Sequence, residues 1–204
     1  DNGTGPYQLE EWVQGDHLTL VPNENYWGEP AKNGGVTFQF FTDETALNNA
    51  LLTNAIDLVI QQESPDQLAQ FENNDNYTVT DGNSIKKWLW TFNNKKEPFT
   101  DVRVRQALYK AIDREAIRSA VWGDYGVVLG SMPPVTEPWY DASFAEIHAY
   151  DPEAAKKLLA EAGATNLSFD ITYVAGGTQE IIVQKLKSDL AAVGVTLNPS
   201  PLDD

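Results

Sequence analysis

The sequence contains no cysteine, two histidines and one methionine. The lack of cysteine excludes disulfides and thiol catalysis. His17 and His148 are the only imidazoles, which leaves little from which to build a histidine metal site or a catalytic triad. Phosphate-binding loops, zinc-peptidase motifs and the G-x-S-x-G turn of hydrolases are also missing. We therefore predict no catalytic residues, no metal and no cofactor.

Basic residues are scarce as well. The 204 residues include 14 Lys and Arg against 30 Asp and Glu, a net charge of −16. A surface of this charge argues against nucleic acid and anionic membranes as partners. No apolar run approaches the roughly 18 residues of a membrane span. The 42% of hydrophobic residues is nevertheless enough for a core in one large or two small domains.

The second half of the chain has the clearest periodic patterns. Thr100 is a good cap for a short amphipathic helix, and Asp113 caps a second one that ends at Gly123. Residues 127–140 contain three prolines and are predicted to be a long loop. Asp151 begins a further helix.

A β-α-β unit is predicted at the end of the chain. Residues 168–173 alternate between apolar and polar types, as a strand does. A helix with aligned apolar positions follows up to Gly194, and residues 195–197 form the returning strand. Such a unit implies parallel pairing and a right-handed crossover.

The first half is predicted to hold more strands. They are a hairpin of residues 7–13 and 17–21 around Gly15, and strands at 36–41, 56–60, 77–80 and 85–92. A helix capped by Thr42 or Asp43 joins two of these strands into another β-α-β unit. Ser64 to Gln67 form a capping box, which predicts a short helix up to Phe71.

Five segments in chain order resemble the large extracellular solute-binding proteins of peptide and nickel ABC importers, family 5. They are residues 3–7 (GTGPY), 25–28 (NYWG), 92–93 (FN), 98–117 (PFTDVRVRQALYKAIDREAI) and 150–163 (YDPEAAKKLLAEAG). This resemblance implies an α/β, two-lobed periplasmic-binding-protein-like fold with mixed sheets flanked by helices. Residues 1–92 would belong to the first lobe, and residues 93–204 would form the N-terminal half of the second.

The resemblance also implies a function. The protein would capture a peptide or related small solute by hinge closure of two lobes, without catalysis, and deliver it to an ABC transporter permease. It would be an extracytoplasmic monomer, periplasmic or a cell-surface lipoprotein. Because the sequence begins without a signal peptide, we expect it to be an internal fragment, with the targeting segment upstream and more lobe sequence downstream.

Two sets of residues are candidate ligand contacts. Trp88 and Trp90 share a face of the predicted strand 85–92, so they form either an aromatic core stripe or a wall of the ligand cleft. Gly176, Gly177, Thr178 and Gln179 connect a strand to a helix and direct backbone N–H groups at whatever lies above the strand ends. The alternative for this loop is an ordinary β-α turn.

In peptide-binding relatives this loop and the first helical turn line the cleft, and some dipeptide binders carry an arginine there. The aligned stretch here reads Gln179-Glu180-Ile181. This departure argues against a short peptide with a paired C-terminal carboxylate, and it is compatible with longer peptides or with ligands that lack a free carboxylate. An acidic secreted carbohydrate-active enzyme with Trp-lined subsites remains the alternative class, and a docking module without a small ligand is a third.

Overall fold

The computed structural model describes residues 3–62 and 65–202. The chain forms two compact units, Asp1–Gln62 and Glu63–Asp204.

The first unit is a small antiparallel sheet followed by one helix. The strands are β1 (Tyr7–Val13), β2 (His17–Pro22) and β3 (Val36–Gln39), in the order β1-β2-β3. The predicted hairpin is confirmed, since Val13 pairs with His17 and Gly15 turns the chain with a φ of 78°. α1 (Glu44–Leu52) begins at Asp43, whose side chain accepts a hydrogen bond from the N–H of Ala46.

Little of this unit is buried. Asn48 is the one buried residue among residues 3–62. Large apolar side chains of the sheet and the following turn lie open instead, with Trp12 63% and Trp27 83% exposed. By the usual measure of about 25 cal/mol per Å² of buried apolar area, the hydrophobic effect contributes little to the stability of this unit.

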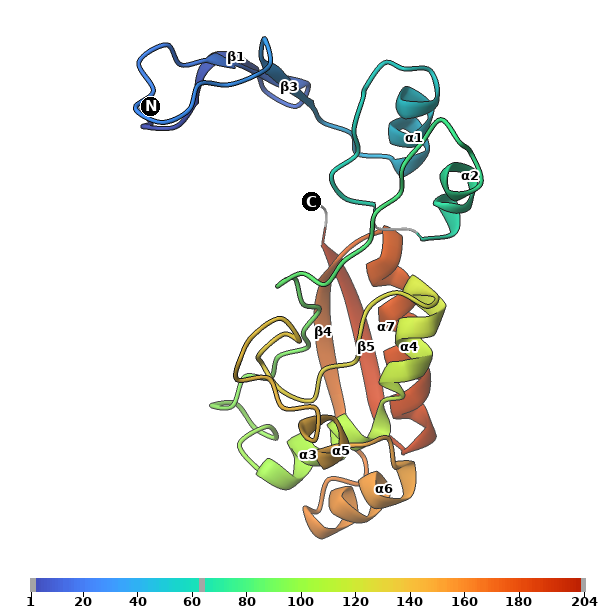
Figure 1. Cartoon of the computed structure of the whole chain (residues 1–204). Helices are drawn as coiled ribbons and strands as arrows, with labels where there is room; N and C mark the ends of the chain where they lie inside the picture. Colours follow the sequence, from blue (N-terminus) through green and yellow to red (C-terminus); the bar gives the residue numbers. More distant parts are fainter. Residues whose placement is uncertain (1–2, 63–64, 203–204) are drawn as a thin grey trace. The chain divides into compact units, whose positions relative to one another are not determined.

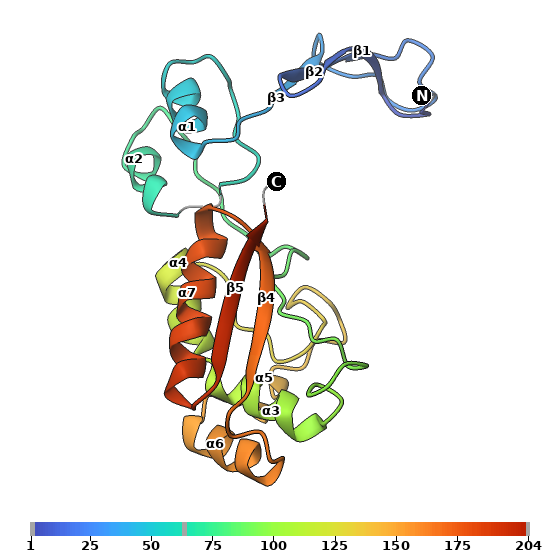
Figure 2. The same ribbon diagram turned by 180° about the vertical axis from the view of Figure 1, so that it is seen from behind.

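The second unit contains the core of the chain. Its helical elements are η1 (Pro65–Gln67), α2 (Ala69–Glu72), α3 (Val102–Ala111), α4 (Arg114–Trp122), α5 (Phe144–Ile147), α6 (Pro152–Glu161) and α7 (Gly177–Ala192), and its strands are β4 (Ser168–Val174) and β5 (Thr196–Leu202). β4 and β5 pair in parallel, so the β-α-β unit predicted at the end of the chain is confirmed. α3 and α6 lie at the end where both strands begin (Figures 1 and 2).

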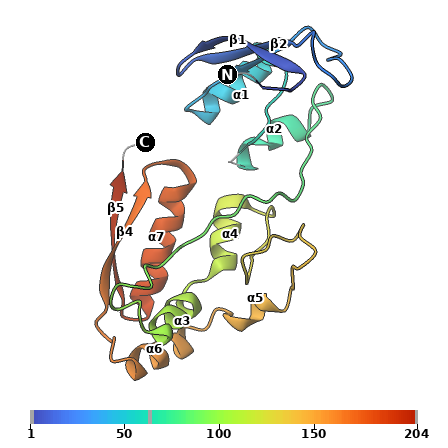
Figure 3. The ribbon, with the colours of Figure 1, turned by 90° about the vertical axis from the view of Figure 1, so that its left-hand side faces the viewer.

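α7 is the central element of this core. It lies between the β4–β5 sheet and α4 (Figure 3). Its apolar stripe includes Leu186 and Leu190, which are 5% and 0% exposed. The stripe packs in one cluster with Leu108 of α3, Leu159 of α6 and Leu197 of β5.

The paired helices are confirmed, with one correction at the cap. Asp101, and not Thr100, begins α3, because its carboxylate accepts the N–H of Arg103 at 2.8 Å. Two adjacent residues of capping type give the same local pattern, so the sequence does not choose between them. Asp113 caps α4 and Gly123 ends it, as predicted.

Three predicted strands are wrong, namely residues 56–60, 77–80 and 85–92, which are irregular in the structure. The first β-α-β unit is therefore also wrong, and β3 pairs only with β2 among the described strands. Leu58 and Ile60 are 73% and 75% exposed. A short apolar run becomes a strand only where a neighbouring strand pairs with it, and periodicity does not reveal that partner.

Of two other predictions, one is confirmed in part and one is not tested. The helix near Phe71 exists as η1 and α2, but Ser64 of its capping box lies outside the described residues. The division at residues 92 and 93 concerns the lobes of a longer protein and stays a prediction. The compact units of this chain divide after Gln62, and Trp90 and Phe92 pack against the core of the second unit.

We expect Leu190→Ala to lower the free energy of unfolding by about 2–5 kcal/mol, because it empties a fully buried site between α7 and its neighbours. The matched control, Leu58→Ala, removes a side chain that is 73% exposed and should change stability by less than about 0.5 kcal/mol. Urea unfolding followed by far-ultraviolet circular dichroism measures both. Equal losses in the two variants would contradict this account of the core.

A second expectation concerns pH. The Asp189 carboxylate, 7% exposed, accepts hydrogen bonds from Lys185 Nζ at 2.6 Å and from the backbone N–H of Asp113 at 3.1 Å. The Asp189 hydrogen bond raises the pKa of Lys185. This stabilisation is fully present below the ordinary lysine pKa of about 10.4 and is lost as pH rises through the raised value.

We therefore expect the free energy of unfolding, measured from about pH 9 upward, to fall more steeply with pH in the natural chain than in Lys185→Met. The methionine variant has no ammonium group at this position that could release a proton. Lys187→Met, on the exposed side of α7, is the control and should keep the steep fall. Identical slopes for the natural chain and Lys185→Met would refute the role of this pair.

Candidate functional site

The loop between β4 and α7 has a backbone that requires glycine. Gly176 and Gly177 have φ angles of 95° and 54°, which side-chain-bearing residues rarely adopt. No atom lies within 4 Å of a Cβ built on either residue, so the space beside them is open. The two glycines therefore serve the turn from the strand end into the helix.

The loop presents a helix N-terminus at the carboxyl end of β4. Gly176 is the N-cap of α7 and makes no side-chain capping hydrogen bond. The first-turn N–H groups of a helix have no partner within the helix and carry partial positive charge. Thr178 and Gln179 lie half-buried in this first turn. The four predicted residues thus lie together in the predicted loop and first turn, while their contact with a ligand stays a prediction.

Glu180 adds a fixed negative charge to this turn. The sequence pattern showed the residue, but it did not predict the hydrogen bonds that hold its carboxylate. Its carboxylate accepts hydrogen bonds from Tyr173 Oη at 2.8 Å and from Gln184 Nε2 at 3.1 Å. The hydrogen bond from Tyr173 is the main cause that lowers the pKa of Glu180, and the bond from Gln184 adds to it. The Tyr173–Glu180 bond also raises the pKa of Tyr173. A tyrosine near a strand end and a Glu-x-x-x-Gln spacing on the next helix were the available signals.

The charge balance of the β4–α7 region is one-sided. No lysine or arginine occurs between Lys157 and Lys185. The turn therefore offers backbone N–H donors and the carboxylate of Glu180, without a cationic side chain of its own. The N–H donors suit a neutral acceptor such as a peptide carbonyl oxygen, whereas the carboxylate of Glu180 disfavours a second carboxylate beside it.

Trp88 and Trp90 lie in different surroundings, because residues 85–92 do not form a strand. Trp88 is 42% exposed, with its ring centroid 5.8 Å from that of Trp122 and Lys86 Nζ 5.7 Å from it. Trp90 is half-buried, 4.7 Å from Phe92 and stacked at 6.0 Å on Phe169 of β4. The shared-face prediction is therefore wrong. None of these ring partners belongs to the loop at residues 176–179.

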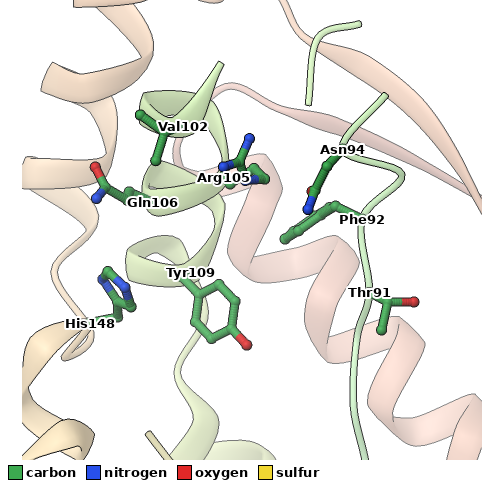
Figure 4. A pocket seen from close by; sticks show the side chains of 8 residues that line it. All are labelled: Thr91, Phe92, Asn94, Val102, Arg105, Gln106, Tyr109 and His148. Carbon is green, nitrogen blue, oxygen red and sulfur yellow. The ribbon is translucent and has the colours of Figure 1, made fainter. Parts of the chain in front are cut away.

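A hollow of about 430 Å³ lies beside α3 in the second unit, and no sequence pattern predicted it. Its lining comes from three elements: α3, the segment around Phe92, and His148 at the end of α5 (Figure 4). The lining residues are Thr91, Phe92, Asn94, Val102, Arg105, Gln106, Tyr109 and His148. It shares no residue with the loop at residues 176–179.

A second hollow, of about 390 Å³, lies between residues 81–86 and the loop 124–135. Tyr125 on its wall donates a hydrogen bond to the Glu72 carboxylate at 2.7 Å, and this bond raises the pKa of Tyr125. Across residues 3–62 and 65–202, no group of three or more His, Asp or Glu is placed to hold a metal ion. Over the same residues, no helix combines the length and apolar character needed to span a bilayer.

Comparison with known proteins gives a consistent result. Residues 2–204 match the family model of the bacterial extracellular solute-binding proteins, family 5 Middle. Heme-binding protein A of Haemophilus influenzae is 28% identical over 204 residues, covering 97% of this chain and 37% of that protein. The dipeptide-binding protein of Escherichia coli is 29% identical over 161 residues, covering 79% of this chain and 30% of that protein.

A solved structure agrees in fold. The ABC transporter-associated periplasmic binding protein DppA of Helicobacter pylori, in complex with the peptide STSA, superposes with a TM-score of 0.84. It is 24% identical, and the match covers 98% of this chain and 39% of that one. The chain thus spans about a third of the length of its curated relatives and has the α/β fold of part of a two-lobed binding protein. Since its match to the family model extends over residues 2–204, the chain belongs to the bacterial extracellular solute-binding proteins, family 5 Middle.

Proposed function

We propose that this chain is part of the substrate-binding component of an ABC importer, which captures a peptide or a related small solute. The family match over residues 2–204 carries this proposal. Ligand capture would proceed by closure of two lobes, because a ligand that contacts both lobes favours the closed state. The chain performs no catalysis in this proposal, and its partner is the permease of the importer.

The β4–α7 loop supports this role. Solute sites need a few fixed polar groups at the mouth of an otherwise preformed cleft. The N–H groups at the start of α7 provide fixed donors, and the two glycines let a ligand backbone approach closely. We propose that Gly176, Gly177, Thr178 and Gln179 contact the ligand. The carboxylate of Glu180 would disfavour a ligand carboxylate at the same place.

We also propose that the chain acts within a longer protein. The first unit has no buried apolar residue among residues 3–62, so further polypeptide would cover its exposed aromatic side chains. In this proposal residues 1–92 belong to the first lobe and residues 93–204 to the second. The protein would act as a monomer outside the cytoplasm, in the periplasm or as a cell-surface lipoprotein.

The family assignment favours solute capture over a carbohydrate-active enzyme with Trp-lined subsites. The two functions differ in a simple assay, because a hydrolase releases reducing ends from a polysaccharide panel and a solute-binding protein does not. Hydrolysis of any polysaccharide in the panel would favour the carbohydrate-active enzyme over solute capture.

The binding test uses calorimetry with the peptide STSA and a panel of dipeptides and tripeptides, added to the 204-residue chain and to a gene product of the relatives' length. We expect binding to the longer protein and at least about a hundredfold weaker binding to the 204-residue chain, since a small-ligand site buries most of the ligand surface between its walls. Equal affinities would contradict the two-lobed site. No binding of any peptide by the longer protein would remove peptides from the proposal.

The two tryptophans should respond differently to substitution. Trp90→Ala should lower the free energy of unfolding by about 3 kcal/mol, because Trp90 packs against the core, whereas Trp88→Ala should lower it by only about 1 kcal/mol. We expect Trp88→Ala to weaken peptide binding by the longer protein if Trp88 borders the cleft. A loss of about 3 kcal/mol in both variants, with unchanged affinity, would make both residues structural.

A further inference from the structure

We propose that the hollow beside α3 is a binding site for a carboxylate group. This inference goes beyond the proposed function, because the hollow shares no lining residue with the loop at residues 176–179. The hollow combines a basic lining, hydrogen-bonding groups without partners in the described structure, and room for a small ligand.

The lining is basic although the protein is strongly acidic. The chain has 30 acidic and 14 basic residues, yet the hollow is lined by Arg105 and His148 and by no carboxylate. Lys110 and Arg114 are close enough to His148 to act on its charge. Positive potential from Arg105, Lys110 and Arg114 attracts an anion to a hollow with partly apolar walls.

Arg105 provides fixed donors for that anion. Its Nη1 donates to the backbone oxygens of Phe99 at 2.6 Å and Thr100 at 3.2 Å, which holds the guanidinium in place. For Nε and Nη2 of Arg105 the described part of the chain supplies no acceptor. Asp101 also lies near Arg105, but its carboxylate is already bound by Arg103, with Nη2 at 2.6 Å. A planar guanidinium whose Nε and Nη2 both remain available is the preferred partner of a carboxylate.

His148 lines the same hollow, and one of its ring nitrogens has no hydrogen-bond partner in the described structure. Its Nδ1 is buried without a hydrogen-bond partner in the described structure, and its ring lies 5.6 Å from that of Tyr109. Burial, followed by the charges of Lys110 and Arg114, lowers the pKa of His148. A buried ring nitrogen without a partner is destabilising, and a polar group that reached it would relieve this penalty.

The remaining polar groups can adapt to such a ligand. Within the described residues, the side-chain amides of Asn94 and Gln106 and the hydroxyl of Tyr109 make no hydrogen bond, and all three line the hollow (Figure 4). A volume of about 430 Å³ accommodates a compact carboxylate. The group could come from a free small molecule or from an acidic side chain of a longer form of this protein, and its chemistry is the same in both cases.

The test is an NMR titration of the 204-residue chain with glutarate, using glutaramide and sodium chloride at equal ionic strength as controls. Glutarate should raise the pKa of His148 by about one unit, since an opposite charge within about 4–6 Å favours the protonated imidazole. His17, which is hydrogen-bonded to Asp16 in the other unit, should not respond. Glutaramide should move neither histidine.

Substitutions locate the effect. Arg105→Gln should weaken glutarate binding about tenfold. Gln106→Ala should weaken it about threefold, and it leaves the hydrogen bonds from Arg105 to Phe99 and Thr100 intact. Arg118→Gln makes the same chemical change on α4 outside the hollow and should bind like the natural chain. Gln106→Ala decides the question if Arg105→Gln fails to fold.

A second arm identifies the source of the carboxylate. If the longer gene product already has a raised His148 pKa and ignores glutarate, its own acidic side chain fills the site. If it responds as the 204-residue chain does, the site takes free carboxylates. The proposal is overturned if glutarate has no more effect than glutaramide on His148 of the 204-residue chain, or if folded Arg105→Gln and Gln106→Ala bind glutarate as well as the natural chain does.

Discussion

The packing of α7 is the constraint on which the second unit depends. One side of this helix carries the apolar residues that join α3, α6 and β5 into a single cluster. The same helix places Asp189 where its two oxygens bind Lys185 and the N–H of Asp113, which begins α4. Apolar burial drives these elements together, and the hydrogen-bonded carboxylate fixes α4 against α7. The position of the β4–α7 loop follows, because the helix that carries it is held along its length.

The two units differ in what holds them together. The second has a buried cluster that includes Leu108 and Leu190, both 0% exposed, whereas the first relies on hairpin hydrogen bonds and leaves Trp12 and Trp27 exposed. Three strands need an apolar face covered by another layer to be stable alone. This contrast agrees with the match of the chain to about a third of its relatives, in which more polypeptide is present.

Electrostatics separates the two candidate sites. At the start of α7, Glu180 is held ionised by Tyr173 and Gln184, and no basic residue occurs between Lys157 and Lys185. Beside α3, Arg105 and His148 line a hollow without any carboxylate. The carboxylate of Glu180 disfavours an anion at the first candidate site, and the guanidinium of Arg105 favours one at the second. A net charge of −16 therefore does not fix the local charge at either candidate site.

Local patterns in the sequence were enough for the paired helices, the helix that begins at Pro152 and the terminal β-α-β unit, because caps and apolar spacing act within a few residues of chain. They also located the glycine turn at residues 176–177, where positive φ angles require glycine. Tertiary structure alone decided that residues 56–60 and 85–92 are not strands, that Trp88 and Trp90 have different neighbours, and that Arg105 and His148 line one hollow. Strand pairing and cavity lining join residues distant in the chain, and such contacts leave no periodic trace in the sequence.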